Sequence, residues 1–417
     1  MREMKDSGIE WIGTIPNHWK CCKQKYVIQL INGRAYSDSE FEENGKYRIL
    51  RVGNLFSNPT WYTSSLELPD DKYCSDGDLL YSWSMSYAPV IWRGEKVIYH
   101  YHIWKTALGK ELSKMFAYYY FISLTDALRS EIHETTMGFI TMGVMNNSYI
   151  AYPEIDEQVA ISNYLDEKCG EYESLISDLQ AQIETLEQYK RSVITEAVTK
   201  GLDPDVEMKE SGVQWIGKTP KHWSVYRIAA LYAERNERGN DELPLLSVSI
   251  NTGVSDSELT DEESARVFVR SEDRSKYKRV YPQDLTYNMM RAWQGAFGAV
   301  RVNGMVSPAY VVAKPLREID TRYIEALFRT PSAIQEMHRY SYGVADFRLR
   351  LYWDKFRTIK VCFPPLEEQH RIADYIDEKA SEIDAIITEK KQQIEMIEEY
   401  KKSLIFEYVT GKKEVQA

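Results

Sequence analysis

The stretch "MKDSGIEWIGTIPNHW" at residues 4–19 returns as "MKESGVQWIGKTPKHW" at residues 208–223. Ten of the sixteen positions are identical, including a Trp-Ile-Gly run and the closing His-Trp pair. Similarity of this length within one chain indicates a tandem duplication, which has to be recognised before a fold is assigned. The sequence therefore predicts one structural unit built twice.

A second repeated stretch closes each half. Residues 152–168 read "YPEIDEQVAISNYLDEK" and residues 363–379 read "FPPLEEQHRIADYIDEK". The match continues through "LEQYKRSVITEAVT" and "IEEYKKSLIFEYVT". Between these ends only a weak correspondence survives, between "GDLLYSWSMSYAP" from Gly77 and "QDLTYNMMRAWQG" from Gln283. The ends of the two halves are thus alike, whereas their interiors differ.

Composition indicates an ordinary globular protein. The 417 residues are 43% hydrophobic and 28% charged, which suits two or more buried cores. No apolar run approaches the roughly 20 residues of a membrane span, and the first residues lack a signal-peptide core, so we expect a cytoplasmic protein. The five cysteines suggest neither a disulfide framework nor a zinc CxxC pair; they are Cys21, Cys22, Cys74, Cys169 and Cys362.

Charge is distributed unevenly along the chain. The net charge of −11 comes from −10 over residues 154–207 and −5 over 366–417, against −1 over 1–153 and +5 over 208–365. The acidic residues therefore lie in the repeated C-terminal segments. A polyanion could approach the two interiors while the acidic segments face elsewhere.

Each acidic segment is predicted to form one long helix. Each follows proline and carries acidic residues in its first turn, where they favour the positive end of the helix dipole. Apolar residues recur in steps of three and four, as in a coiled-coil seam, with lysines in the gaps. The seam residues are Ile176, Leu179, Ile183, Leu186 and Val193 in the first copy and Ile387, Ile394, Ile397 and Leu404 in the second. The two helices are natural partners for each other, antiparallel about a pseudo-twofold axis.

The interiors contain signals for both strands and helices. Residues 96–104 and 307–315 are predicted as strands, whereas residues 115–134 and 321–340 are predicted as amphipathic helices. We therefore predict an α+β fold with two pseudo-symmetric globular domains separated by two long antiparallel coiled-coil helices. The predicted parts are a first domain at 1–153, a central helix at 154–201, a linker and second domain at 202–365, and a C-terminal helix and tail at 366–417.

Motifs for catalysis are weak throughout. "NPTW" at Asn58–Trp61 is close to the adenine-holding loop of amino-methyltransferases, but Thr60 replaces a proline and no glycine-rich turn precedes it, so an ordinary turn is the favoured alternative. His100 and His102 would share one strand face, where they are metal ligands or structural histidines, and no third ligand is near. "PDDK" at Pro69–Lys72 lacks the spacing of a nuclease site, and no GxxxxGK[ST] phosphate loop occurs. We predict that the chain is not an enzyme.

Cations interleaved with aromatic residues point instead to DNA. Arginine can pair with guanine, Asn and Gln with adenine, and lysine with phosphate. In the second half the candidate DNA-binding residues are Arg274, Lys276, Lys278, Arg279, Tyr287, Asn288, Arg291, Trp293, Gln294 and Arg301. In the first half they are Tyr81, Trp83, Tyr87, Arg93, Lys96 and Lys105. Any one of them is also explained as an ordinary surface or core residue.

We call the repeated stretches at residues 4–19 and 208–223 the first and second frame. Together with the other repeated stretches, they resemble the specificity subunit of type I restriction-modification systems. The resemblance rests on "SGIEWIGTIPNHW" and "SGVQWIGKTPKHW", on "YNMMRAWQGAFG" with "SPAYVV", on "PEIDEQVAI" and "PPLEEQHRI", and on "YKRSVITEAVTKG". It covers essentially the whole chain. It implies two target-recognition domains, each reading one half of a split double-stranded DNA target across a gap of unread base pairs. The first domain departs from the second at "YSWSMSYAP".

The resemblance also implies the partners. Two modification subunits would carry S-adenosylmethionine and the adenine chemistry, restriction subunits would use ATP and Mg, and this chain would hold no cofactor or metal and contact no membrane. A self-sufficient DNA methyltransferase or nuclease, or a coiled-coil scaffold without DNA affinity, are the alternatives. If the helices set the gap, one heptad added after Leu186 and after Ile397 should lengthen it.

Overall fold

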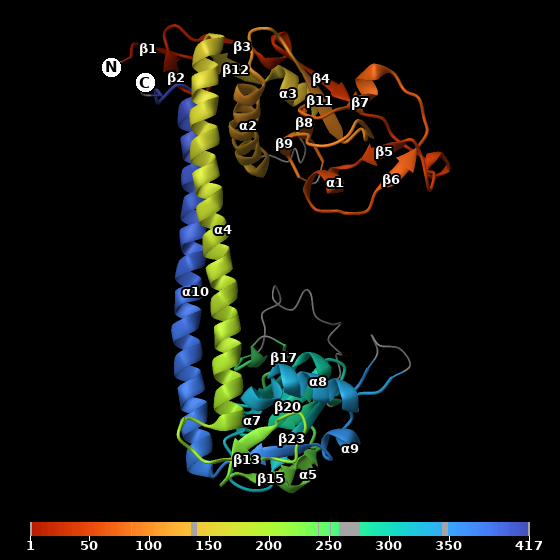
Figure 1. Ribbon diagram of the computed structural model, residues 1–417, viewed down its shortest axis with the longest axis vertical. Helices are drawn as coiled ribbons and strands as arrows, with labels where there is room; N and C mark the ends of the chain where they lie inside the picture. Colours follow the sequence, from red (N-terminus) through yellow and green to blue (C-terminus); the bar gives the residue numbers. More distant parts are fainter. Residues whose placement is uncertain are drawn as a thin grey trace. The chain divides into compact units, whose positions relative to one another are not determined.

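A computed structural model describes most of the chain in two compact units (Figure 1). The described residues are 2–84, 86–134, 140–240, 242–250, 252–257, 276–343 and 349–415. The first unit comprises residues 1–179 with 391–417, and the second comprises residues 180–390. Each unit therefore combines one domain with parts of both repeated C-terminal segments.

The first unit is a mixed domain of short strands and helices. Its strands are β1 (Met4–Asp6), β2 (Thr14–Pro16), β3 (Lys20–Lys23), β4 (Ile28–Asn32), β5 (Tyr47–Leu50), β6 (Tyr62–Ser64), β7 (Tyr73–Cys74), β8 (Leu79–Ser82), β9 (Ala88–Ile91), β10 (Val97–Tyr99), β11 (Ile103–Leu108) and β12 (Tyr149–Tyr152). Its shorter helices are α1 (Val52–Phe56), α2 (Lys114–Glu134) and α3 (Met142–Asn147), with 3-10 turns η1 (Gln24–Tyr26), η2 (Asp38–Glu40) and η3 (Asp70–Lys72).

The second unit repeats much of this order of elements. Its strands are β13 (Met208–Glu210), β14 (Lys218–Pro220), β15 (Ser224–Arg227), β16 (Tyr232–Arg235), β17 (Val248–Ser249), β18 (Gly253–Val254), β19 (Lys278–Val280), β20 (Leu285–Asn288), β21 (Phe297–Ala299), β22 (Gly304–Val306), β23 (Tyr310–Pro315) and β24 (Lys360–Phe363). Its shorter helices are α5 (Ile228–Leu231), α7 (Thr321–Phe328), α8 (Pro331–Tyr340) and α9 (Trp353–Phe356), with the 3-10 turn η5 (Ala292–Gln294).

The central sheets of the two domains have the same topology. Antiparallel strands pair in the order β4-β11-β8-β9 in the first domain and β16-β23-β20-β21 in the second. A two-stranded ladder joins the ends of each interior, β3 with β12 and β15 with β24. The mixed α+β class predicted from sequence is confirmed in both domains.

Two of the predicted elements are interrupted. The predicted strand at residues 96–104 is wrong as one strand, because the chain turns at His100–His102 between β10 and β11. The predicted helix at residues 321–340 is two helices, α7 and α8. Thr330 caps α8 by accepting a hydrogen bond from the backbone of Ala333, and Pro331 occupies the first turn, so the chain restarts there.

The repeated C-terminal segments are the long helices α4 (Ile155–Lys200) and α10 (Leu366–Val409). Along α4 the contacted residue of α10 falls in number as the α4 residue rises, so the pair is antiparallel. The contacts are Tyr164 with Tyr408, Tyr172 with Tyr400 and Glu173 with Lys401 in the first unit, and Gln182 with Lys390 and Lys190 with Asp384 in the second. Figure 1 shows α4 and α10 side by side.

The predicted seam lies at the contact between these helices. Leu179, Ile387 and Leu404 are buried, and the other six predicted seam residues are half-buried. The lysines that interrupt the pattern reach across to the opposite helix, where Lys190 pairs with Asp384 at 2.6 Å and Lys401 pairs with Glu173. These two ion pairs occupy equivalent places in the duplication. Two of the gaps in the hydrophobic repeat are therefore filled by cross-helix charge pairs.

The register also corrects the proposed insertion points. Leu186 and Ile397 are equivalent in the repeat, but they do not face each other. The contacts at Gln182 and Lys190 place Leu186 opposite the segment around Ile387. A heptad added after Leu186 and after Ile397 would shift the segment between these points out of register. Facing insertions belong after Gln182 and after Lys390, whose side chains are 2.6 Å apart.

Candidate nucleic-acid interface

The β20–β21 loop of the second domain carries the predicted residues Arg291, Trp293 and Gln294. Its start is fixed because Asn288, which is buried, accepts a hydrogen bond from the Met290 backbone at 3.0 Å through its side chain. The indole of Trp293 donates to the Met290 carbonyl at 3.0 Å. Arg291 is exposed and Gln294 is half-buried on the same turn, η5. The loop thus presents a guanidinium and an amide from a hydrogen-bonded support.

The other candidates of the second domain do not share this loop. Lys278 donates to the Tyr310 carbonyl at 2.9 Å, and burial lowers its pKa. Arg279 lies over the ring of Tyr281, and Arg301 is 3.8 Å from Asp256. Lys276 is exposed and lies two residues before β19. Arg274 lies outside the described residues.

The first-domain candidates are more dispersed. Trp83 and Tyr87 are half-buried in the β8–β9 loop, in the place equivalent to the β20–β21 loop. Each of the three predicted cations has a partner within its own region. Lys96 lies 4.2 Å above the ring of Tyr73, Lys105 pairs with Asp78 at 2.7 Å, and Arg93 is 3.8 Å from Asp76.

Tyr81 and Tyr287 are core residues, which corrects their prediction as DNA contacts. Both side chains are 0% exposed. They occupy equivalent positions on β8 and β20, with Tyr81 stacked on Trp104 and Tyr287 packed against Phe297 and Phe356. A base could not reach either ring in the folded domain. Their aromatic character serves packing, which the interleaved pattern of cations and aromatics does not distinguish from recognition.

The repeated frames join each domain to a long helix by the same contacts. In the first unit Glu157, in the first turn of α4, binds His18 at 2.8 Å and the indole of Trp19 at 3.2 Å. In the second unit Glu368 of α10 binds the equivalent histidine and tryptophan at 2.7 and 3.1 Å. Burial acts to raise the pKa of Glu157, but hydrogen bonds from His18, Arg2 and Trp19 outweigh it and lower the pKa.

A glutamine beside each of these glutamates makes further contacts between the domain and the long helix. We call the contacts of this glutamate and glutamine, together with the histidine and tryptophan of the frame, the joint. Gln158 donates to the Pro153 carbonyl at 2.8 Å and accepts from the Ser113 backbone at 2.8 Å, just before α2. Gln369 makes the same two bonds to Pro364 and to the Asp320 backbone, just before α7. The Glu-Gln pairs were not predicted as functional residues, although "EQ" occurs in both copies of the repeat.

The far ends of the long helices return to the frames. Gly411, which follows α10, has φ +70°, and a Cβ atom there would lie 2.5 Å from Pro16 and 3.1 Å from the ring of Trp19. Gly201, which follows α4, has φ +78° and lies beside Trp223 in the same manner. Glycine is needed at both places because the backbone is left-handed and the approach is close. Each frame tryptophan therefore contacts the start of one long helix and the end of the other.

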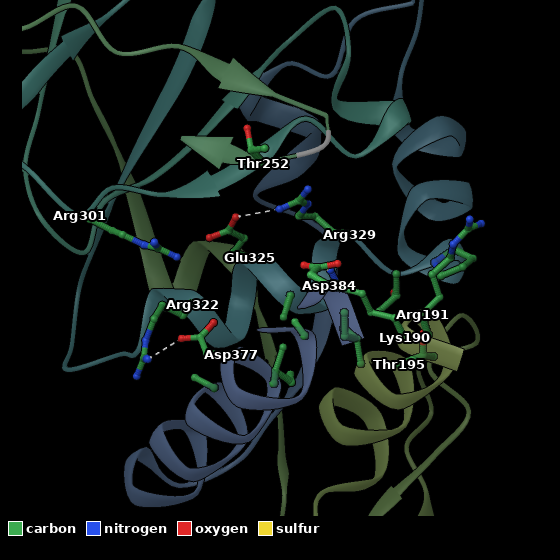
Figure 2. Close-up of a pocket in the computed structure, with 17 residues that line it drawn as sticks. Lys190, Arg191, Thr195, Thr252, Arg301, Arg322, Glu325, Arg329, Asp377 and Asp384 are labelled. Carbon is green, nitrogen blue, oxygen red and sulfur yellow. Dashed lines mark hydrogen bonds and ion pairs between the residues drawn. The ribbon is translucent and has the colours of Figure 1, made fainter. Parts of the chain in front are cut away.

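A cavity of about 500 Å³ lies within the second unit, between α4, α10 and α7 (Figure 2). Most of its charged side chains are paired with one another. Arg322 binds Asp377 at 2.9 Å, Glu325 binds Arg329 at 3.1 Å, and Lys190 binds Asp384. Burial raises the pKa of Glu325. The Arg322–Asp377 pair holds α7 to α10 and the Lys190–Asp384 pair holds α4 to α10. The three pairs give the cavity a mixed rather than a single-sign lining.

The weaker sequence motifs have ordinary structures. Asn58 of "NPTW" accepts a hydrogen bond from the Thr60 backbone at 2.8 Å, which is the bond of an Asx turn. Lys72 of "PDDK" pairs with Asp71 at 3.0 Å. Among the described residues, no group of three or more His, Cys, Asp or Glu side chains could hold a metal ion. No helix in the described part of the chain is long and apolar enough to cross a membrane.

Comparisons with known proteins agree on one family. A family model described as "Type I restriction modification DNA specificity domain" matches residues 16–185 and 271–396, more than half of the chain. The type I restriction enzyme MjaVIII specificity subunit of Methanocaldococcus jannaschii is 23% identical, over 95% of this chain and 93% of its own length. The EcoBI specificity subunit of Escherichia coli is 20% identical, over 92% and 84%.

A solved structure shares the fold. One chain from work on complex assembly and conformational transition of "the type I R-M system" matches with a TM-score of 0.65 at 12% identity, over 95% of this chain and 98% of its own. The match covers both mixed domains and both long helices.

Proposed function

Because the chain belongs to the type I restriction modification DNA specificity family, we propose that it is the recognition subunit of such a system. It reads a split, asymmetric DNA target, one half-site per domain, and directs adenine methylation or restriction by partner subunits. The methyl donor, ATP and Mg are held by those partners, and this chain carries out no chemistry of its own.

One observation carries the proposal. The two domains place equivalent loops, β8–β9 and β20–β21, on equivalent sheets, yet the loops carry different side chains. The second loop offers Arg291 and Gln294, which suit guanine and adenine edges, whereas the first offers Trp83 and Tyr87. A target with two unlike half-sites requires two recognition domains that share a fold but differ in their exposed side chains.

The long helices supply two equivalent docking surfaces for partners. Leu175 and Tyr400 form a first apolar patch, 46% and 54% exposed, where Tyr400 contacts Tyr172 one turn from Leu175. Ile386 and Tyr189 form a second apolar patch, 43% and 57% exposed. The duplication makes Ile386 the equivalent of Leu175 and Tyr400 the equivalent of Tyr189. Two matching patches, one in each unit, support two copies of the modification subunit.

Binding and methylation of randomised duplex DNA test the function. The chain with its modification subunits should select a split sequence and methylate adenine within it. The chain alone should transfer no methyl group above a heat-killed control. A chain that methylates or cuts DNA by itself would contradict the proposal, as would a complex that shows no sequence preference.

Patch variants test the partner arrangement. Leu175→Glu with Tyr400→Glu should remove one modification subunit, and the same change at Ile386 and Tyr189 should remove the other. Native mass spectrometry counts the bound copies. Val159→Glu is a matched control, because Val159 is a 43% exposed apolar residue of α4 that lies about four turns before Leu175 and outside both patches. If either double variant keeps two partners, the patches are not the docking surfaces.

A further inference from the structure

The turn between β10 and β11 gathers His100, Tyr101 and His102 at one end of the first domain's central sheet. The ring of Tyr101 lies 4.5 Å from His100 and 4.0 Å from His102, measured between centroids. Trp83, at the start of the β8–β9 loop, has its ring 5.1 Å from His102. The turn and the loop therefore form one surface, of which the sequence predicts only the loop as a DNA contact.

Backbone hydrogen bonds fix the turn. The Trp83 indole donates to the Tyr101 carbonyl at 2.8 Å, and the Trp83 backbone donates to the His102 carbonyl at 3.2 Å. The Tyr101 backbone donates to the Arg34 carbonyl at 3.1 Å. Trp83 is itself stacked on the buried Trp104 at 5.7 Å. The side chains of the turn are thus presented from a rigid base, which lowers the entropy lost when they bind.

The exposed chemistry of the turn suits base edges better than phosphates. Tyr101 is 38% exposed and carries a phenolic hydroxyl. Burial, the neighbouring His102 and Arg51 lower the pKa of His100 to about 4. Burial and Arg51 also lower the pKa of His102, so both imidazoles are neutral near pH 7. A neutral imidazole has one donor and one acceptor, and an aromatic face can contact a thymine methyl group.

The second domain has no such turn among its described residues. The equivalent turn, between β22 and β23, reads Ser307-Pro308-Ala309. Its neighbour across the sheet end is the β20–β21 loop with Arg291 and Gln294. The same corner of the sheet thus carries its recognition chemistry on the turn in the first domain and on the loop in the second.

We propose that Tyr101 and His102 are specificity-determining residues of the first domain and contact base edges in the first half-site. This proposal rests on the proposed function and adds the residues that read one half of the target. Arg51, exposed beside the turn, supplies the nearby positive charge.

Site selection tests the proposal. The chain with its modification subunits selects sites from a duplex pool randomised over both half-sites, and bound sequences are read out. Tyr101→Ala and His102→Ala should each relax preference at one or two positions of the first half-site and weaken the parental site by about 5- to 150-fold. The second half-site should stay the same. Tyr101→Phe and His102→Leu keep much of the volume of each side chain but remove its hydrogen-bonding groups, and they should relax the same positions.

Tyr26→Ala is the matched control. Tyr26 is 71% exposed and lies in η1, before β4, at the opposite end of the sheet, because Ile28 of β4 pairs with Leu108 and Asn32 pairs with Trp104. It should leave the site and the affinity unchanged. If the Tyr101 and His102 variants select the parental first half-site with unchanged affinity, the proposal is wrong while the function stands. If the unaltered complex selects no site, the proposed function itself fails.

Discussion

The joints between domain and helix are nearly identical in the two halves, whereas the corners of the two central sheets share almost no chemistry. In both joints a buried tryptophan and the histidine before it bind one glutamate, at 3.2 and 2.8 Å in the first unit and 3.1 and 2.7 Å in the second. At the equivalent corner of the central sheet, the first domain has a turn of tyrosine and histidine, whereas the second domain has a loop with arginine and glutamine. Position is therefore held by one set of residues and recognition by another.

Exchange of a whole domain interior should have the largest effect on the DNA target. If residues 21–150 are replaced by the interior of a relative, the first half-site should change completely, because every loop of the first reader is replaced. The second half-site and the gap should persist, because the glutamate contacts to the histidine and tryptophan of both joints lie outside the exchanged residues. Sequencing methylated adenines in cells that carry the chimera measures the target. A swap that altered both halves together would show that the domains do not read independently.

Removal of the joint tryptophans should cost nearly as much in stability as any core change. Trp19→Ala and Trp223→Ala should each lower the free energy of unfolding by about 3 to 5 kcal/mol, because both side chains are 1% exposed. The two costs should add within about 0.5 kcal/mol, since the residues bind different glutamates in different units. Urea unfolding followed by hydrogen exchange in each unit measures them. Strong coupling between the two changes would mean that the joints are not independent copies.

Lengthening the helix pair should have a narrower effect. One heptad added after Gln182 and one after Lys390 keeps the seam in register and adds about 10 Å. At 3.4 Å per base pair, the unread gap should grow by up to about three base pairs, with both half-sites unchanged. Site selection from a randomised pool measures the gap. The same insertion after Leu186 and after Ile397 is the control, because it should destabilise the pair; an unchanged gap would make the helices a docking surface only.

The smallest effect concerns the two equivalent core tyrosines. Tyr81 shares a 2.8 Å hydrogen bond with Thr125, so Tyr81→Phe should cost about 0.5 to 1.5 kcal/mol of stability. The Tyr287 hydroxyl is buried without a hydrogen-bond partner among the described residues, so Tyr287→Phe should be neutral or stabilising. Thermal unfolding of the two variants compares them. Equal losses would place a partner beside the Tyr287 hydroxyl.

The sequence predicted the parts of the fold that periodicity and repetition control. The long helices were found within one residue of their observed starts, because proline and acidic first-turn residues mark them. The duplicated frame predicted a pseudo-symmetric pair of domains, which the comparisons confirm. The break at His100–His102 could not be read from the β-prone residues around it, because the turn is set by hydrogen bonds to Leu50 and Arg34 from other parts of the chain.

Recognition residues were harder to predict than the fold. Burial decides whether an aromatic side chain packs or binds, and Tyr81 and Tyr287 have the same local pattern as exposed tyrosines. Equivalent contacts in the two halves can also be made by different residues, so an alignment of the halves does not show them. Asp166 accepts a hydrogen bond from Tyr119 at 2.6 Å, while the equivalent Asp377 binds Arg322 at 2.9 Å. The two contacts do the same work with different chemistry, which sequence comparison of the halves does not reveal.

The end of α10 contacts the first frame, so this contact can form only after nearly all of the residues between them have been synthesised. Lys412 donates to the Ile12 carbonyl at 2.6 Å, and Gly411 lies against Trp19. A ribosome that has made Trp19 needs about 20 to 80 s, at 5 to 20 residues per second, to reach these partners. The second frame waits only for the start of α10 to leave the exit tunnel. A message cut before the codon for Gly411 therefore yields one finished joint and one open joint, and the open joint should make the first unit more sensitive to protease.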